Sequence, residues 1–90
     1  MYIISYDIRN PRRLQRVAKI MENYGTRVQY SVFECLIDNK LHDKLIHELK
    51  KVIDEEEDTI RSYELCKLCI KRVKIIGQGT LTEDKEFYIF

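Results

Sequence analysis

Hydrophobic residues recur along this chain with two different periods, and the change of period marks the expected elements. Residues 1–8 alternate one by one but are mostly apolar, which is typical of a central strand covered on both faces. After Asn10, a good helix N-cap, and Pro11, a good first helical residue, apolar positions return at helical spacing. Gly25 suits the position that ends a helix. The start of the chain therefore predicts a strand followed by a helix.

The middle of the chain predicts a pair of strands, a second helix and a loop. Residues 27–38 are expected to be extended, but the alternation of their apolar residues shifts by one position halfway along. One uninterrupted strand would therefore expose some of these apolar side chains. A tight turn or bulge near residues 29–31 resolves the slip and gives a short strand followed by a longer one. Residues 39–53 carry an apolar stripe at helical spacing, and the five acids of residues 54–58 predict a solvated loop.

A third long strand is expected at residues 59–65, with a glycine turn at residues 77–79 and an aromatic, strand-like end at residues 87–90. The order strand, helix, strand pair, helix, strand predicts one α+β domain over residues 1–90. Its fold class is ferredoxin-like βαββαβ with an antiparallel sheet, both helices on one face and an extra C-terminal strand. Apolar strand residues in both phases favour a homodimer, with residues 78–90 as a tail that completes the partner's sheet.

Composition limits the class of protein without naming an activity. Ninety residues make one small domain, which buries only about 60–65% of its unfolded surface and often gains stability by association. No apolar run is long enough to span a membrane, and the start of the chain lacks the features of a signal peptide. We therefore expect a cytoplasmic protein without a membrane partner, whose three cysteines are thiols.

Charge is unevenly distributed along the chain, although the net charge is only +1. Residues 1–30 hold six basic and two acidic side chains, whereas residues 31–60 hold four basic and nine acidic ones. Four arginines fall within residues 9–16, and arginine favours bidentate contact with phosphate. A basic face on an otherwise neutral protein is compatible with nucleic-acid binding, and a solvated helix face remains the alternative.

Asp7 at the end of the first strand, followed by Arg12 and Arg13 in the first helical turn, is the main candidate site. Cations are unfavourable in that turn, so guanidinium groups and free backbone N–H groups together suggest an anion site. Magnesium binds carboxylates together with water and phosphate oxygens, and two symmetry-related Asp7 side chains would supply a credible ligand set. The alternative is that Asp7 caps the turn or pairs with Arg9.

Two further groups leave alternatives open. Cys66 and Cys69 form a C-x-x-C motif, which is either half a zinc site, a redox pair or a pair of structural cysteines. Tyr6, Tyr30 and Phe33 are either strand core or aromatic platforms for nucleic-acid bases, with Ser31 beside them.

The segments YIISYDI, RVAKIMENYG, RVQYSVFEC and SYELCKLC resemble the CRISPR-associated protein 2 family over essentially the whole chain. The resemblance implies a ferredoxin-like homodimer that acts in spacer acquisition, bridges the integrase CRISPR-associated protein 1 and holds a DNA duplex. It also implies magnesium-dependent endonuclease activity on DNA or single-stranded RNA, with Asp7 as the metal ligand. Positions tied to that activity are matched by Tyr6, Arg16, Arg27, Ser31 and Phe33. Nucleic-acid backbone is expected at Arg12, Arg13 and Arg16.

Two hypotheses from different classes follow. The first is a metal-dependent phosphodiesterase that uses Asp7, and the second is a structural adaptor and DNA-binding dimer in which Asp7 only stabilises the interface. We favour the adaptor as the biological role and the nuclease as an intrinsic activity. A toxin-like small ribonuclease outside spacer acquisition is the alternative.

Overall fold

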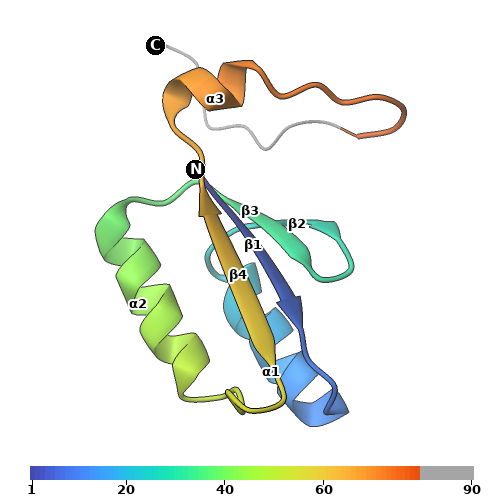
Figure 1. Cartoon of the computed structure of the whole chain (residues 1–90), viewed down its shortest axis with the longest axis vertical. Helices are drawn as coiled ribbons and strands as arrows, with labels where there is room; N and C mark the ends of the chain where they lie inside the picture. Colours follow the sequence, from blue (N-terminus) through green and yellow to red (C-terminus); the bar gives the residue numbers. More distant parts are fainter. Residues whose placement is uncertain (80–90) are drawn as a thin grey trace.

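The structure is a computed structural model, and residues 1–79 of the chain are described (Figure 1). The elements in chain order are β1 (Tyr2–Asp7), α1 (Pro11–Glu22), β2 (Thr26–Gln29), β3 (Val32–Cys35), α2 (Asn39–Lys50), β4 (Thr59–Glu64) and α3 (Lys67–Lys71). The four strands form one antiparallel sheet in the order β2-β3-β1-β4. This confirms the predicted ferredoxin-like α+β fold. The extra C-terminal strand and all but the first two residues of the tail at 78–90 lie outside the described residues.

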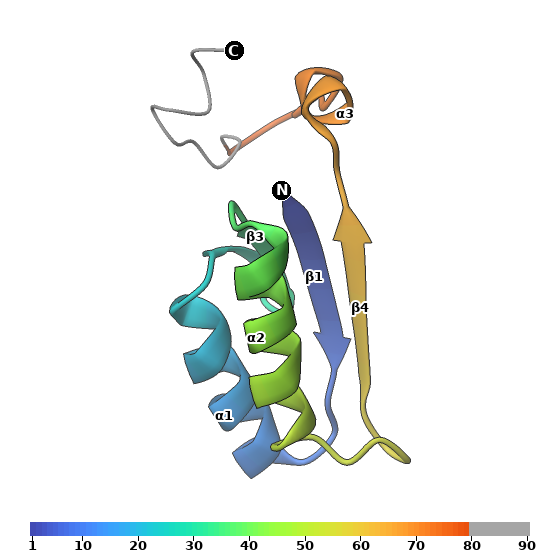
Figure 2. The same cartoon turned by 90° about the vertical axis from the view of Figure 1, so that its left-hand side faces the viewer.

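Helices α1 and α2 cover the same face of the sheet, and the other face is open within residues 1–79 (Figure 2). Strand β1 alternates accordingly: Tyr2, Ile4 and Tyr6 are buried, whereas Ser5 is half-buried and Asp7 is exposed. The core joins the even-numbered side of β1 to both helices and to β3. Its fully buried side chains are Ile4, Val17, Met21, Phe33, Cys35, Leu45 and Leu49.

The phase slip in the middle of the chain is a β-bulge followed by a turn, as predicted. Arg27 pairs with Phe33, but Gln29 pairs with Val32, so β2 has one residue more than β3 over this stretch. Two residues, Tyr30 and Ser31, then connect the strands. Arg27 pairs with Phe33 before the bulge and therefore shares the helix-covered face with it.

Helix α1 begins as the sequence predicts and ends differently. The Asn10 side-chain oxygen accepts hydrogen bonds from the backbone N–H groups of Arg12 and Arg13, at 3.0 and 3.1 Å. Gly25, however, does not have the positive φ expected at a helix end. It is required for close approach: an added Cβ would lie 2.5 Å from both the Cys35 Sγ and the Glu34 carbonyl oxygen. The C-cap of α1 is Asn23, so Gly25 lies one residue beyond the C′ position that the sequence predicted for it.

Two expectations for the second half need correction. Asp58, the last residue of the acidic run, is buried rather than solvated, although Glu55–Glu57 are exposed. Cys66 is the N-cap of a short helix, α3, which the sequence did not predict. The glycine turn is confirmed, because Gly77 and Gly79 have φ values of 98° and 129°.

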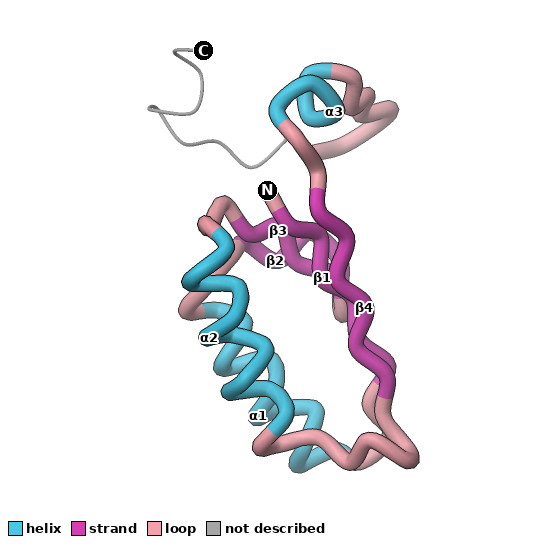
Figure 3. The backbone as a smooth tube through the Cα atoms, turned by 60° about the vertical axis from the view of Figure 1, so that its left-hand side comes forward, coloured by secondary structure: helices cyan, strands magenta, loops and turns pink. Residues whose placement is uncertain are grey.

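Helix α3 lies beyond the end of the sheet at which the chain starts (Figure 3). Just before α3, the Leu65 N–H donates to the Met1 carbonyl oxygen at 2.7 Å, and the Met1 ammonium donates to the Leu65 carbonyl oxygen at 3.2 Å. This reciprocal pairing extends the contact between β1 and β4 up to α3. Within residues 1–79, no helix is both long enough and apolar enough to cross a membrane.

Candidate functional site

Asp7 lies at the C-terminal end of β1, on the open face of the sheet. It pairs with Thr59 of β4 and is exposed. A shallow hollow of about 250 Å³ is formed here by Ser5, Tyr6, Asp7, Thr59 and Arg61. In the part of the chain that the structure describes, no hydrogen bond or ion pair engages the Asp7 carboxylate. The alternatives in which it caps the turn or pairs with Arg9 are therefore not observed.

The residues of one chain fit a magnesium ion only in part. Among residues 1–79, Asp7 is the sole acid lining the hollow, and Arg61 brings a positive charge to the same space. Within residues 1–79, no three histidine, cysteine or acidic side chains are grouped so that they could hold a metal ion. Because magnesium is usually held by one or two carboxylates together with water and phosphate oxygens, a second copy of Asp7 would complete a conventional ligand set.

Tyr6, Phe33 and Arg27 lie on the opposite, helix-covered face of the sheet. Tyr6 and Phe33 are buried in the core with ring centroids 6.2 Å apart. The Arg27 guanidinium lies 5.2 Å from the Phe33 ring centroid and 6.0 Å from that of Tyr30, within the range of cation–π attraction. The predicted site residues therefore divide into two groups. Asp7 lies on the open face, whereas Tyr6 and Phe33 are buried on the helix-covered face with the exposed Arg27 beside them.

The Tyr6 hydroxyl is the chemically unusual group on the helix-covered face. It is buried and has no hydrogen-bond partner in the described structure. Burial raises the pKa of Tyr6, and the positive charge of Arg27 offsets part of that rise. A second hollow of about 160 Å³ opens beside this group and is lined by Tyr6, Leu14, Gln15, Ala18, Arg27 and Tyr30. This polar end of an otherwise apolar core has room for a water molecule or a small polar group.

A backbone hydrogen bond, and not the hydroxyl of Ser31, holds Ser31 beside Tyr6. The Tyr6 N–H donates to the Ser31 carbonyl oxygen at 3.1 Å, which continues the contact between β1 and β3 beyond the regular strand pairing. The side chain of Ser31 is half-buried. Its observed role is to hold the turn after β2 against the end of β1.

The three predicted phosphate contacts on α1 are not equivalent. Arg12 and Arg16 are exposed. Arg13 is instead drawn to the loop before β4, where its Nε donates to Asp58 at 2.8 Å and its Nη2 donates to Glu57 at 3.0 Å. The hydrogen bond from Arg13 holds the pKa of Asp58 below its ordinary value, and the hydrogen bond to Asp58 raises the pKa of Arg13. The guanidinium of Arg13 is thus already occupied by carboxylates.

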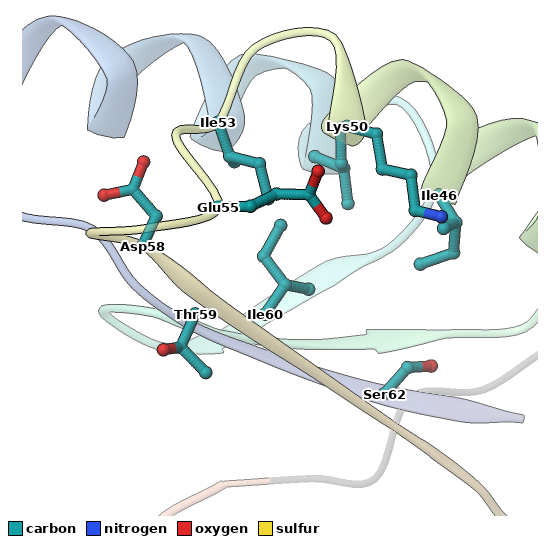
Figure 4. A pocket seen from close by; sticks show the side chains of 9 residues that line it. Ile46, Lys50, Ile53, Glu55, Asp58, Thr59, Ile60 and Ser62 are labelled. Carbon is teal, nitrogen blue, oxygen red and sulfur yellow. The ribbon is translucent and has the colours of Figure 1, made fainter.

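A third hollow, of about 280 Å³, lies between α2 and β4 and contains none of the predicted site residues (Figure 4). Its floor is apolar, and Figure 4 shows Ile53, Glu55 and Ile60 directed into the space between the helix and the strand. Strand β4 is at the edge of the described sheet. The groove is therefore a packing surface beside an edge strand and contains none of the predicted site residues.

Sequence reasoning missed Arg61 and Gln15, which line the two hollows near β1. A signal for Arg61 was present, because alternation along residues 59–65 places Thr59 and Arg61 in the same phase. Gln15 had no comparable signal, since its place beside Tyr6 depends on how α1 packs on the sheet.

Taken together, these features define a small ferredoxin-like domain with an exposed acid, Asp7, at the end of its first strand and exposed arginines on the helix that follows. The chain belongs to the CRISPR-associated protein Cas2 family, whose model matches residues 1–73. It is 41% identical over 87 residues to the CRISPR-associated endoribonuclease Cas2 3 of Chloroflexus aurantiacus, covering 97% of this chain and 94% of that relative.

Solved structures agree with this assignment. The crystal structure of Streptococcus pyogenes Cas2 at pH 6.5 is 40% identical, has a TM-score of 0.74 and aligns with 84% of this chain and 98% of its own. A chain from a partial Cas6-RT-Cas1–Cas2 complex is 33% identical, with a TM-score of 0.66 and coverage of 83% of this chain and 88% of that one. The family and the ferredoxin-like fold are therefore established for this chain.

Proposed function

We propose that this protein acts in CRISPR adaptation as a cytoplasmic homodimer that bridges the integrase CRISPR-associated protein 1 and holds duplex DNA. The observation that carries the proposal is the open face of the sheet, which no helix covers within residues 1–79 and on which Tyr63 and Asp7 are exposed. The similarity to a chain of a partial Cas6-RT-Cas1–Cas2 complex supports the choice of partner.

The open face supports the proposed homodimer because it exposes apolar side chains beside Asp7. Ile3 of β1 pairs with Tyr63 of β4, and Ser5 pairs with Val32 of β3, so these side chains share that face. Tyr63 is 52% exposed. A second copy of the chain would cover this surface and bring a second Asp7 to the same place.

DNA binding is assigned in this proposal to Arg12 and Arg16 on α1. Both are exposed, and neither shows an ion pair among the described residues. Arg13 has a supporting role, because its contacts with Glu57 and Asp58 fix α1 against the loop before β4. Backbone contacts of this kind give affinity that depends on salt but not on base sequence.

Magnesium-dependent cleavage of RNA or DNA is the second candidate, favoured by Asp7 itself. Asp7 residues of two copies would hold the ion, which would lower the pKa of a bound water and stabilise charge on phosphate. Tyr6, Arg27 and Phe33 lie on the other side of the sheet. In this proposal they keep the end of β1 in position and do not face the phosphate that Asp7 would meet.

The substitution Asp7→Asn separates the two functions, because it keeps the shape of the side chain and removes its charge. Spacer acquisition in cells, binding to the integrase, and Mg²⁺-dependent hydrolysis of single-stranded RNA and duplex DNA are measured on the same variant. The matched control is Asp43→Asn, which removes an exposed acid on α2. We expect acquisition and integrase binding to persist, while any hydrolysis falls by about two orders of magnitude or more.

Three outcomes would change this assignment. Equal hydrolysis by wild type and Asp7→Asn would place cleavage at another site or in a contaminant. Loss of acquisition by Asp7→Asn with DNA and integrase binding intact would exclude a purely structural role. Growth arrest on expression in cells without an integrase gene would favour a toxin-like ribonuclease.

A further inference from the structure

Cys66 and Cys69 form a paired thiol group at the start of α3 that the proposed function does not use. Their sulfur atoms lie 3.3 Å apart, and both residues are exposed. The Cys69 N–H donates to the Cys66 sulfur at 3.4 Å, so the backbone holds Cys66 in place as well. Because a disulfide bond is about 2.0 Å long, closing one here requires only a small approach of the two side chains.

The surroundings of the pair favour reaction at one sulfur. Hydrogen bonds from the backbone N–H and the side chain of Cys69 lower the pKa of Cys66, and the hydrogen bond to Cys66 raises the pKa of Cys69. The backbone N–H of Leu68 also lowers the pKa of Cys66.

Cys35 provides an internal contrast. It is fully buried in the core, and burial raises its pKa to about 11. A thiol of that kind is almost entirely protonated at neutral pH and has no access to reagents. The chain therefore carries one inert thiol and one accessible pair.

We propose that Cys66 and Cys69 form a reversible dithiol–disulfide pair that exchanges with small-molecule disulfides of the glutathione type. The Cys66 thiolate attacks one sulfur of the disulfide, forms a mixed disulfide and releases the first thiolate of the reagent. Cys69 then loses its proton to solvent, attacks the Cys66 sulfur and releases the second thiolate. The protein is oxidised by two electrons, and the reagent disulfide is reduced to two thiols.

Redox exchange fits the site better than zinc binding. A structural zinc site needs four ligands, and C-x-x-C supplies only two. Within residues 1–79, no third histidine, cysteine or acidic side chain joins the pair in a group able to hold a metal ion. Disulfide exchange needs no ligand beyond the two sulfurs that already touch.

The test uses the full chain, reduced and then incubated with oxidised glutathione without oxygen, and reads intact mass and free thiols. Wild type is expected to lose the thiols of Cys66 and Cys69, to carry no lasting glutathione and to recover both thiols with dithiothreitol. Cys69→Ser is expected to retain glutathione on Cys66, because no resolving thiol remains. Cys66→Ser keeps a good N-cap and is expected to react several-fold more slowly at Cys69. Cys35 is expected to be labelled only after the chain is unfolded.

Distinct results would overturn the proposal. Wild type that keeps all three thiols, or that retains glutathione as stably as Cys69→Ser, would show that the pair does not close. Zinc released stoichiometrically by a chelator, with both thiols protected until then, would assign the pair to metal binding between chains. Unchanged circular dichroism of the variants shows that lost reactivity does not come from unfolding.

Discussion

Arg13 donates from Nε to an Asp58 carboxylate oxygen at 2.8 Å, and this contact joins the first turn of α1 to the loop that leads into β4. The two residues are 45 positions apart. The side chain of Asp58 is fully buried, whereas that of Arg13 is 22% exposed. Asp58 also accepts a hydrogen bond from the Asp54 N–H at 2.9 Å, so its charge is satisfied from both sides.

The substitution Asp58→Asn is expected to destabilise the fold by about 2 kcal/mol, because it weakens hydrogen bonds to a buried charged group. Urea denaturation followed by circular dichroism measures this change. The control Glu57→Gln removes an exposed partner of the same arginine and should change the free energy of unfolding by less than about 0.5 kcal/mol. Equal effects of the two substitutions would contradict a special role for Asp58.

The same contact predicts how stability depends on pH. Arg13 holds the pKa of Asp58 below its ordinary value, so the carboxylate stabilises the folded state fully above an ordinary pKa of about 4. That stabilisation is lost as the pH falls through the lower pKa of the folded state. Wild type should therefore lose more stability than Asp58→Asn between about pH 5 and pH 3. Parallel pH profiles of the two proteins in urea denaturation would contradict this.

Nucleic-acid binding is expected to depend on Arg12 and Arg16 more than on an equivalent cation elsewhere. Each change to alanine should weaken binding to duplex DNA and reduce the salt dependence by about one unit of slope per lost phosphate contact. Fluorescence anisotropy over a range of salt concentrations measures both effects. Lys44→Ala, on the exposed side of α2, is the matched control, and an equal loss in that variant would mean that no particular face is used.

Gly25→Ala is expected to destabilise the protein by about 1–3 kcal/mol through overpacking. The added methyl group would meet the Cys35 sulfur and the Glu34 carbonyl oxygen, both at 2.5 Å, and the carbonyl is fixed within β3. Thermal unfolding gives a sufficient measurement. The double variant Gly25→Ala with Cys35→Ala should recover little, because the backbone clash remains; full recovery would assign the cost to the sulfur alone.

Local patterns along the chain predicted most of the fold. Helical spacing located α1 and α2, Asn10 marked the first cap, and the phase slip in residues 27–38 located the bulge before Tyr30. These features depend on neighbours within a few positions, so the sequence alone carries them. Helix α3 was missed because five residues are too few to establish a helical period.

Features that depend on residues far apart in the sequence could not be predicted from local patterns. Nothing local distinguishes Asp58 from the other acids of its run, because its burial depends on Arg13. The division of the site was accessible from the sequence: Tyr6 and Asp7 are consecutive, and consecutive strand residues face opposite sides of a sheet. The family resemblance nevertheless groups them in one set of site residues.

The bulge in β2 also determines which changes of chain length this hairpin can accept. Arg27 opposite Phe33 and Gln29 opposite Val32 are both regular pairings, with Val28 as the additional residue between them. A natural variant lacking Val28 would keep both pairings and both faces. One lacking a residue of β3 would turn the following side chains to the wrong side of the sheet. Length variation among homologous hairpins should therefore be concentrated at this one position.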